Sequence, residues 1–179
     1  MHPAVERLTA LIPPTGPRHS RDWPGVEQAL GTPLPGDYKQ LVEIYGGGVF
    51  DGTVWLLDPA CPDEDYELVA AAAERAEVLA CLWQTEPVPD EVRDTGARVI
   101  PWAYVEGSGA YVYWLVRPGL KPDEWTVMLN EGRGPGWEHH ATSCAPFLLS
   151  VLTGEAKSGY FSGLLSQDHR FESNDDVLE

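Results

Sequence analysis

Hydrophobic residues between positions 22 and 58 recur with the spacing of two short helices. In the first helix, Pro24 occupies the first turn, where a missing N–H costs nothing, and Gly31 marks the end. Pro35 opens the second helix, and the glycines at 46–48 supply its C-terminal cap. Four side chains of the second helix share one face, which should pack on the core: Tyr38, Leu41, Val42 and Tyr45.

Strand-like sequence follows the second helix. Val49 and Phe50 are separated from Thr53–Leu57 by Asp51-Gly52, a dipeptide typical of a two-residue hairpin turn because both positions take positive φ. Three further strands are predicted at residues 98–105, 110–116 and 125–130, with a short edge strand at 137–140. Both alternating sets of side chains in the strand at 110–116 are apolar. This pattern indicates either cover on both faces or one face exposed as an aromatic platform.

Helical patterns flank these strands. They predict helices at residues 3–12 and 65–83, and a last helix that begins after Thr142 or Ser143 and ends at Gly154. The helix at 65–83 should pack through one apolar face, made of Tyr66, Val69, Ala73, Ala76, Ala80 and Trp83. One more helical turn is expected around Phe161, Leu164 and Leu165, and the chain from Ser173 onward should be frayed.

These elements predict an α+β fold in a single domain, residues 1–179. The antiparallel sheet should hold about five or six strands, flanked by N-terminal and C-terminal helices. Residues 1–21 form an N-terminal helix and loop, residues 22–165 form the core, and residues 166–179 form an acidic, partly disordered tail. At 179 residues the chain is long enough to bury a substantial core.

The same stretch from 22 to 58 resembles the opening motif of the SUKH superfamily. The matching residues are Trp23, Val26-Glu27, Leu30-Gly31, Leu34-Pro35, Asp37-Tyr38-Lys39, Leu41 and Tyr45-Gly46. A looser match continues at Ile100-Pro101-Trp102, Tyr113-Trp114, Pro122-Asp123-Glu124-Trp125 and Phe147-Leu148-Leu149. Members of that superfamily include bacterial immunity proteins of polymorphic toxin systems and a fungal cell-wall regulator. The resemblance implies an α+β fold and a toxin-binding role, but its Trp, Leu, Gly and Pro residues place no binding site.

The net charge is −16, with 28 acidic and 12 basic residues. The segment from Asp58 to Asp94 alone holds eleven acids and two bases, and residues 168–179 hold five acids and one base. A body this acidic repels nucleic acid and anionic membranes. The charge is explained either by solubility or by a surface that steers in a basic protein, as an inhibitor of a basic nuclease toxin would need.

Several patterns exclude other classes of protein. No apolar run approaches the roughly 20 residues of a membrane span, and Glu6-Arg7 interrupts the N-terminal segment, which therefore does not resemble a signal peptide. A cytoplasmic location is the expectation. The three cysteines are few and far apart, which predicts neither a disulfide framework nor a zinc site: Cys61, Cys81 and Cys144.

Candidate catalytic patterns are weak. The glycines at 46–48 connect a helix to a strand, whereas phosphate-binding loops connect a strand to a helix. His139 and His140 would point to opposite faces of a strand and have no third ligand nearby, and Ser108 lacks the spacing of a nucleophile elbow. We expect no catalytic residues, no metal and no cofactor.

Two classes of function remain open. The first is an immunity protein that inhibits a cognate toxin, a basic nuclease-type domain, by non-covalent occlusion. The second is a small cytoplasmic enzyme or a regulatory scaffold domain with an unrecognised ligand pocket. For the first class, the predicted partner-binding residues are Asp51, Asp63, Glu64, Asp65, Glu67 and Glu106. Acidic residues at positions 63–65 could equally stabilise the first turn of the following helix through its dipole.

Overall fold

The computed structural model describes residues 1–93, 95–161 and 168–178, and these residues contain one antiparallel sheet of seven strands. The strands are β1 (Gly48–Phe50), β2 (Val54–Leu56), β3 (Arg98–Val105), β4 (Ala110–Val116), β5 (Thr126–Asn130), β6 (Glu138–His140) and β7 (Phe171–Ser173). Their spatial order is β6-β5-β4-β3-β2-β1-β7. The predicted α+β class is confirmed, and the sheet holds one strand more than the upper expectation.

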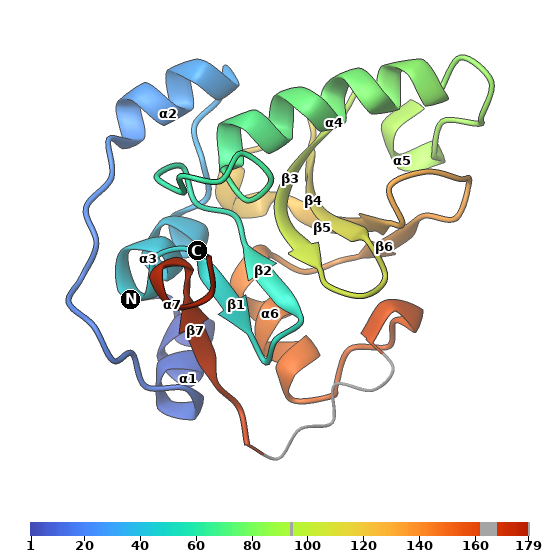
Figure 1. Cartoon of the computed structure of the whole chain (residues 1–179). Helices are drawn as coiled ribbons and strands as arrows, with labels where there is room; N and C mark the ends of the chain where they lie inside the picture. The colour runs from blue at the N-terminus through green and yellow to red at the C-terminus, as the bar shows by residue number, and fades with distance from the viewer. Residues whose placement is uncertain (94, 162–167, 179) are drawn as a thin grey trace.

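Helices cover both faces of this sheet (Figure 1). One face packs against α1 (Pro3–Leu11), α3 (Gly36–Tyr45) and α6 (Cys144–Leu152), and the other against α4 (Leu68–Leu82) and α5 (Asp90–Arg93). In β4, Trp114 packs on Tyr38 of α3, while Tyr113 and Leu115 pack with residues of α4 and α5. Cover on both faces is therefore the correct alternative for residues 112–115, while Tyr111 at the start of the strand is half-buried. The remaining helices are α2 (Trp23–Leu30), η1 (Pro122–Glu124), η2 (Gly159–Phe161) and α7 (Asn174–Val177).

The hairpin between β1 and β2 differs from the prediction by one residue. Asp51 and Gly52 have positive φ, 52° and 63°, as expected for the turn. Phe50 pairs with Val54, however, so Thr53 belongs to the loop rather than to the strand. The carbonyl of Thr53 accepts a hydrogen bond of 2.7 Å from the N–H of Glu106 in the neighbouring β3–β4 turn. The N–H of Thr53 donates a hydrogen bond of 3.0 Å to the Phe50 carbonyl, so Thr53 closes the turn instead of extending the strand.

Helix α4 begins three residues later than predicted and packs through a different face. The Glu67 side chain caps it by accepting hydrogen bonds from the N–H groups of Val69 and Ala70, at 3.1 and 2.6 Å. The acids at 63–65 precede the helix and are not its first turn. The buried residues of the helix are Leu68, Ala71, Arg75 and Leu79, whereas Ala73, Ala76 and Ala80 are exposed. The predicted alanine face was therefore wrong, because the buried cation Arg75 and the bulkier Leu68 and Leu79 turn inward instead.

The prediction that the chain frays from Ser173 was also wrong. Residues 171–173 form β7, which pairs with β1, and α7 follows at once. The Phe171 ring contacts Tyr45 and Phe50, with ring centroids 5.1 and 4.7 Å away. Apolar packing and a strand ladder thus hold this acidic segment. Of the predicted helical turn near its start, Phe161 lies in η2, while Leu164 and Leu165 fall outside the described residues.

The predicted helix face at 35–45 is confirmed, since Tyr38, Leu41, Val42 and Tyr45 are all buried. Leu41 is 0% exposed. We expect Leu41→Ala to lower the free energy of unfolding by about 2–5 kcal/mol, because it removes apolar contacts and leaves a cavity. Urea denaturation measures this loss. The exposed helical substitution Gln28→Ala should change stability by no more than about 0.5 kcal/mol, and an equal loss for both variants would contradict the packing described.

Docking of β7 depends on the absence of a side chain at Gly48. A Cβ atom there would come within 3.0 Å of the Glu172 carbonyl oxygen and the Phe171 ring. We expect Gly48→Ala to displace β7 and make the C-terminal segment the first site of cleavage in limited proteolysis followed by mass spectrometry. Gly16→Ala is the matched control, because nothing lies within 4 Å of its added Cβ. A cleavage pattern unchanged from wild type would show that β7 does not require this glycine.

Candidate partner-binding surface

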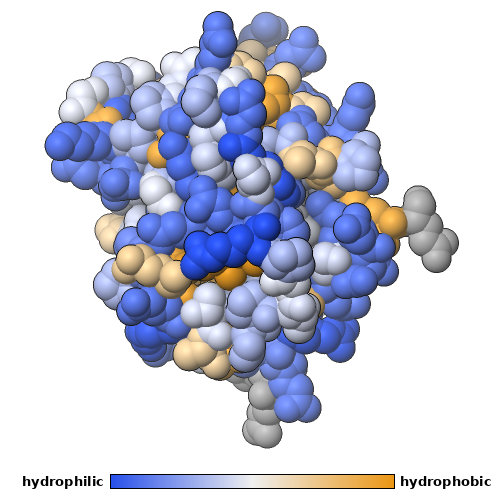
Figure 2. Space-filling model, turned by 90° about the vertical axis from the view of Figure 1, so that its left-hand side faces the viewer, coloured by the Kyte–Doolittle hydropathy of each residue, from blue (hydrophilic) through white to orange (hydrophobic). Residues whose placement is uncertain are grey.

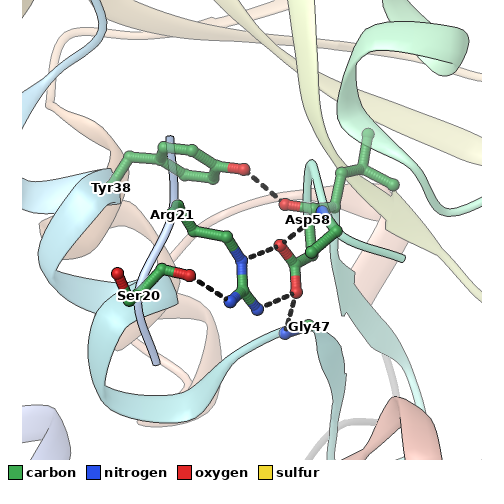
Figure 3. Close-up of polar contacts among 7 residues, drawn as sticks. Ser20, Arg21, Tyr38, Gly47 and Asp58 are labelled. Carbon is green, nitrogen blue, oxygen red and sulfur yellow. Dashed lines mark hydrogen bonds and ion pairs between the residues drawn. The ribbon is translucent and has the colours of Figure 1, made fainter. Parts of the chain in front are cut away.

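The buried carboxylate of Asp58 joins three separate parts of the chain (Figure 3). The Arg21 guanidinium donates two hydrogen bonds to it, at 2.7 and 2.6 Å. The backbone N–H groups of Gly47 and Ala60 donate two more, at 2.9 and 3.0 Å. Each carboxylate oxygen therefore accepts two bonds, which fills the four acceptor positions of the group. Asp58 is consequently a structural anchor rather than a free base, and its hydrogen bond raises the pKa of Arg21.

The backbone of Asp58 also fixes the acidic loop that leads to α4. Its N–H donates to the Tyr66 carbonyl at 3.1 Å, and its own carbonyl accepts from the Leu68 N–H at 3.3 Å. The neighbouring Leu57 carbonyl accepts a hydrogen bond from the hydroxyl of the fully buried Tyr38. The loop at residues 58–67 is therefore held against α3 and the end of the sheet, and its exposed acids have a defined position.

The six predicted partner-binding residues differ in solvent exposure and in the hydrogen bonds that they form. Glu64, Asp65 and Glu106 are exposed. Asp63 is half-buried and accepts a hydrogen bond of 3.0 Å from the Asp65 N–H. Glu67 is engaged as the cap of α4. Asp65 and Glu106 are 41 positions apart in the sequence, yet both contribute to raising the pKa of Tyr66 and the pKa of Tyr104.

Asp51 does not belong to this acidic group, and its assignment to the rim is corrected. Its side chain is 2% exposed and pairs with the Nδ1 atom of His169 at 2.7 Å. It also accepts a hydrogen bond of 2.8 Å from the Arg170 N–H. The carboxylate thus turns towards the C-terminal segment, where it anchors the approach to β7.

Four aromatic side chains form a continuous surface beside the exposed acids, and we call them the aromatic row: Trp55, Tyr66, Tyr104 and Tyr111. Trp55 pairs across the sheet with Tyr104, and Tyr104 pairs with Tyr111. Tyr66, from the loop before α4, stacks on Trp55 with ring centroids 4.1 Å apart. Trp55 is buried, whereas the three tyrosines are half-buried. The row therefore combines a rigid base with accessible rings.

The acids surround this row closely enough to affect its electrostatics. The pKa of Tyr66 is raised to about 12, mainly because the phenol is desolvated by burial. The negative charge of Glu106 adds to this rise, and Asp65 contributes less. Burial and the same two acids raise the pKa of Tyr104. Glu106 also accepts a hydrogen bond of 2.8 Å from the Trp55 indole N–H. The phenols therefore remain neutral donors at physiological pH, beside carboxylates that stay exposed.

Arg75 supports the row from beneath. Its guanidinium lies over the Tyr111 ring, 4.7 Å from the centroid, and donates to the Tyr113 hydroxyl at 2.9 Å and the Gly132 carbonyl at 2.5 Å. The cation is buried, so its charge is compensated by these acceptors and by the ring face rather than by water. This contact fixes the tyrosines of β4 against α4.

Part of this row was predictable from the positions of two tyrosines about the β3–β4 turn. Tyr104 and Tyr111 lie equally far from the centre of the β3–β4 turn, so antiparallel pairing places them opposite one another. Trp55 joins them only because β2 pairs with β3, a contact between residues 49 positions apart. The arrangement of Tyr66 depends on the Asp58 hydrogen bonds and could not be read from local pattern.

Other faces and other chemistry are less specific. The side of the molecule formed by α1, α2 and their connecting loop is mostly hydrophilic, with apolar residues in small separate areas (Figure 2). Across residues 1–93, 95–161 and 168–178, no three His, Cys, Asp or Glu side chains are grouped so as to hold a metal ion. Within the same ranges, every helix is too short or too polar to span a bilayer.

Comparison with protein-family models, with curated proteins and with solved structures finds no match to this chain.

The buried pair of Asp58 and Arg21 predicts unequal effects of truncation. The two side chains are 4% and 14% exposed. Asp58→Ala should lower the free energy of unfolding by about 3–5 kcal/mol, because it leaves the Arg21 charge and two backbone N–H groups without their acceptor. Arg21→Ala should cost less, since Gly47 and Ala60 continue to bond the carboxylate. Urea denaturation of both variants decides the order, and a larger loss for Arg21→Ala would contradict the central role of Asp58.

Proposed function

We propose that this chain is an immunity protein that binds a cognate toxin domain and inhibits it by non-covalent occlusion. The observation that carries the proposal is the aromatic row itself, in which Tyr66 stacks on Trp55 and the exposed Glu106 accepts a hydrogen bond from the Trp55 indole N–H at 2.8 Å. The binding surface consists of this row together with Glu64, Asp65 and Glu106. We propose that the chain acts in the cytoplasm, without catalysis and without a cofactor.

Charge supports a basic partner. The chain carries 28 acids against 12 bases, and the exposed acids of this surface border half-buried rings rather than lying on a uniformly polar helix face. Complementary charge raises the association rate of a basic protein and disfavours acidic competitors. A toxin nuclease must be basic in order to bind nucleic acid, so an inhibitor with an acidic surface is complementary to it in charge.

The aromatic row supports protein binding more than it supports solubility alone. Tyrosine and tryptophan are enriched among interface residues that contribute most of the binding energy, because they present large rigid area with a polar tip. Here Trp55 and Arg75 hold the tyrosine rings in place, so little side-chain entropy is lost on docking. The resemblance of residues 22–58 to the SUKH superfamily points towards the same role.

The partner is first sought among the products of the neighbouring genes, above all the C-terminal domain of any large secreted protein encoded there, by coexpression and copurification. Association and dissociation rates are then measured by surface plasmon resonance at several salt concentrations. The combined variant Glu64→Gln, Asp65→Asn and Glu106→Gln should associate at least about tenfold more slowly at low salt, with a weaker salt dependence. Tyr104→Ala should mainly raise the dissociation rate, because it removes contact area rather than charge.

A matched control changes the same number of exposed acids elsewhere: Glu6→Gln, Glu155→Gln and Asp175→Asn. This control keeps the net charge equal to that of the test variant, so equal slowing by both would show that total charge rather than this surface steers the toxin. Glu67→Gln separates the capping role, and it should lower thermal stability while leaving the association rate unchanged. Failure of the toxin domain to copurify with wild-type protein would contradict the proposed function.

A further inference from the structure

An apolar groove runs between α2, α4 and the start of β3. Its volume is about 350 Å³, within the range of small-molecule sites. The alanines of α4 that were expected to face the sheet form its wall instead. It is lined by Ala29, Leu30, Val69, Ala72, Ala73, Ala76, Leu79, Ala80, Trp83, Arg98, Val99 and Ile100. Since Val69 and Trp83 are 14 helical positions apart, the groove is roughly 20 Å long, which suits an extended chain rather than a compact ring.

The charged residue that lines this groove is Arg98, whose side chain is exposed. Among the described residues, Arg98 donates a single hydrogen bond, to the Leu30 carbonyl at 3.1 Å, so most of its five N–H donors remain available. Arg98 also lines an adjoining pocket of about 340 Å³ that contains Arg117. The Nε atom of Arg117 is buried and has no hydrogen-bond partner within the part of the chain that the structure describes.

Within residues 1–93, 95–161 and 168–178, neither of these two arginines forms an ion pair. Arg21 and Arg170, by contrast, pair with Asp58 and Glu172, in a chain whose acids outnumber its bases by 28 to 12. Among the residues that the structure describes, no acidic side chain lines either the groove or the adjoining pocket. Unpaired guanidinium groups beside an apolar wall are suited to a ligand that brings its own anion.

We propose that this groove binds a free single-chain amphiphile with an anionic head, of the long-chain carboxylate type. The acyl chain lies along the alanines of α4, and the carboxylate bonds to Arg98, with Arg117 adding a second positive charge. Charge complementarity favours this occupant over a helix of the basic toxin, whose cations the two arginines would repel. The site is separate from the aromatic row, so the inference does not depend on the proposed immunity function.

Isothermal titration calorimetry of the purified full chain with octanoate, decanoate and dodecanoate, each below its micelle concentration, tests the proposal. Each added methylene should tighten binding about fourfold while the chain still lengthens along the groove. Dodecyltrimethylammonium has the same apolar chain and the opposite charge, and it should bind at least about tenfold more weakly than dodecanoate. Equal affinity for both heads would overturn the role of the arginines.

Variants locate the site. Ala76→Trp, at an exposed helical position, should fill the groove and weaken dodecanoate binding at least about tenfold, whereas Ala141→Trp adds the same side chain at an exposed position outside it. Arg98→Gln should weaken dodecanoate binding about five- to tenfold, whereas Arg7→Gln, an equal loss of charge on α1, should not. Circular dichroism confirms that each variant is folded. Unchanged binding to folded Ala76→Trp would refute this groove as the site, and binding lost equally in Arg7→Gln would indicate a non-specific charge effect.

Discussion

The hydrogen bonds to the Asp58 carboxylate constrain the whole N-terminal half of the fold. A buried carboxylate is stable only when its acceptor positions are filled, and here four donors fill them. Those donors come from the loop before α2, the turn between α3 and β1, and the turn that follows β2. Because all of them must reach the same group, the positions of two helices, one hairpin and the loop to α4 are set together.

Helix α4 lies between two separate surfaces, the aromatic row and the apolar groove. Its inward residues recur at helical spacing and include the cation Arg75, which bonds Tyr113 and covers the Tyr111 ring. With that face turned inward, the flank towards the β2–β3–β4 turns borders the aromatic row, and the alanine flank remains open beside α2. A partner protein and a small amphiphile could therefore use the same helix without competing for the same residues.

The acidic residues have two different roles: some bond to the protein's own backbone, and others remain exposed to solvent. Glu67 and Asp51 are engaged with the protein's own backbone, as a helix cap and as an anchor for the chain before β7. Glu64, Asp65 and Glu106 remain exposed. Net charge therefore does not measure the strength of the proposed steering surface, since part of the charge serves folding. Among the exposed acids, Asp65 and Glu106 both act on the half-buried rings of Tyr66 and Tyr104.

Local sequence determined the elements whose form depends on neighbouring residues. The apolar stripe of α3, the positive φ of Asp51 and Gly52, and the strands β3 and β4 follow from short-range sterics and from periodicity, and the structure matches them. The α+β class was predictable for the same reason. Of the candidate site, the exposure of Glu64, Asp65 and Glu106 in turns was predictable from local pattern as well.

Tertiary structure decided the features that depend on distant partners. The Asp51 side chain is buried because it meets His169, 118 positions away, and β7 is ordered because Gly48 leaves room for its backbone. The inward face of α4 depends on the contacts of Arg75 with Tyr113 and Gly132, which no helical periodicity contains. The physical reason is the same in each case. Periodicity specifies which residues share a face, but the contact energy that selects the buried face comes from residues that only the folded chain brings together.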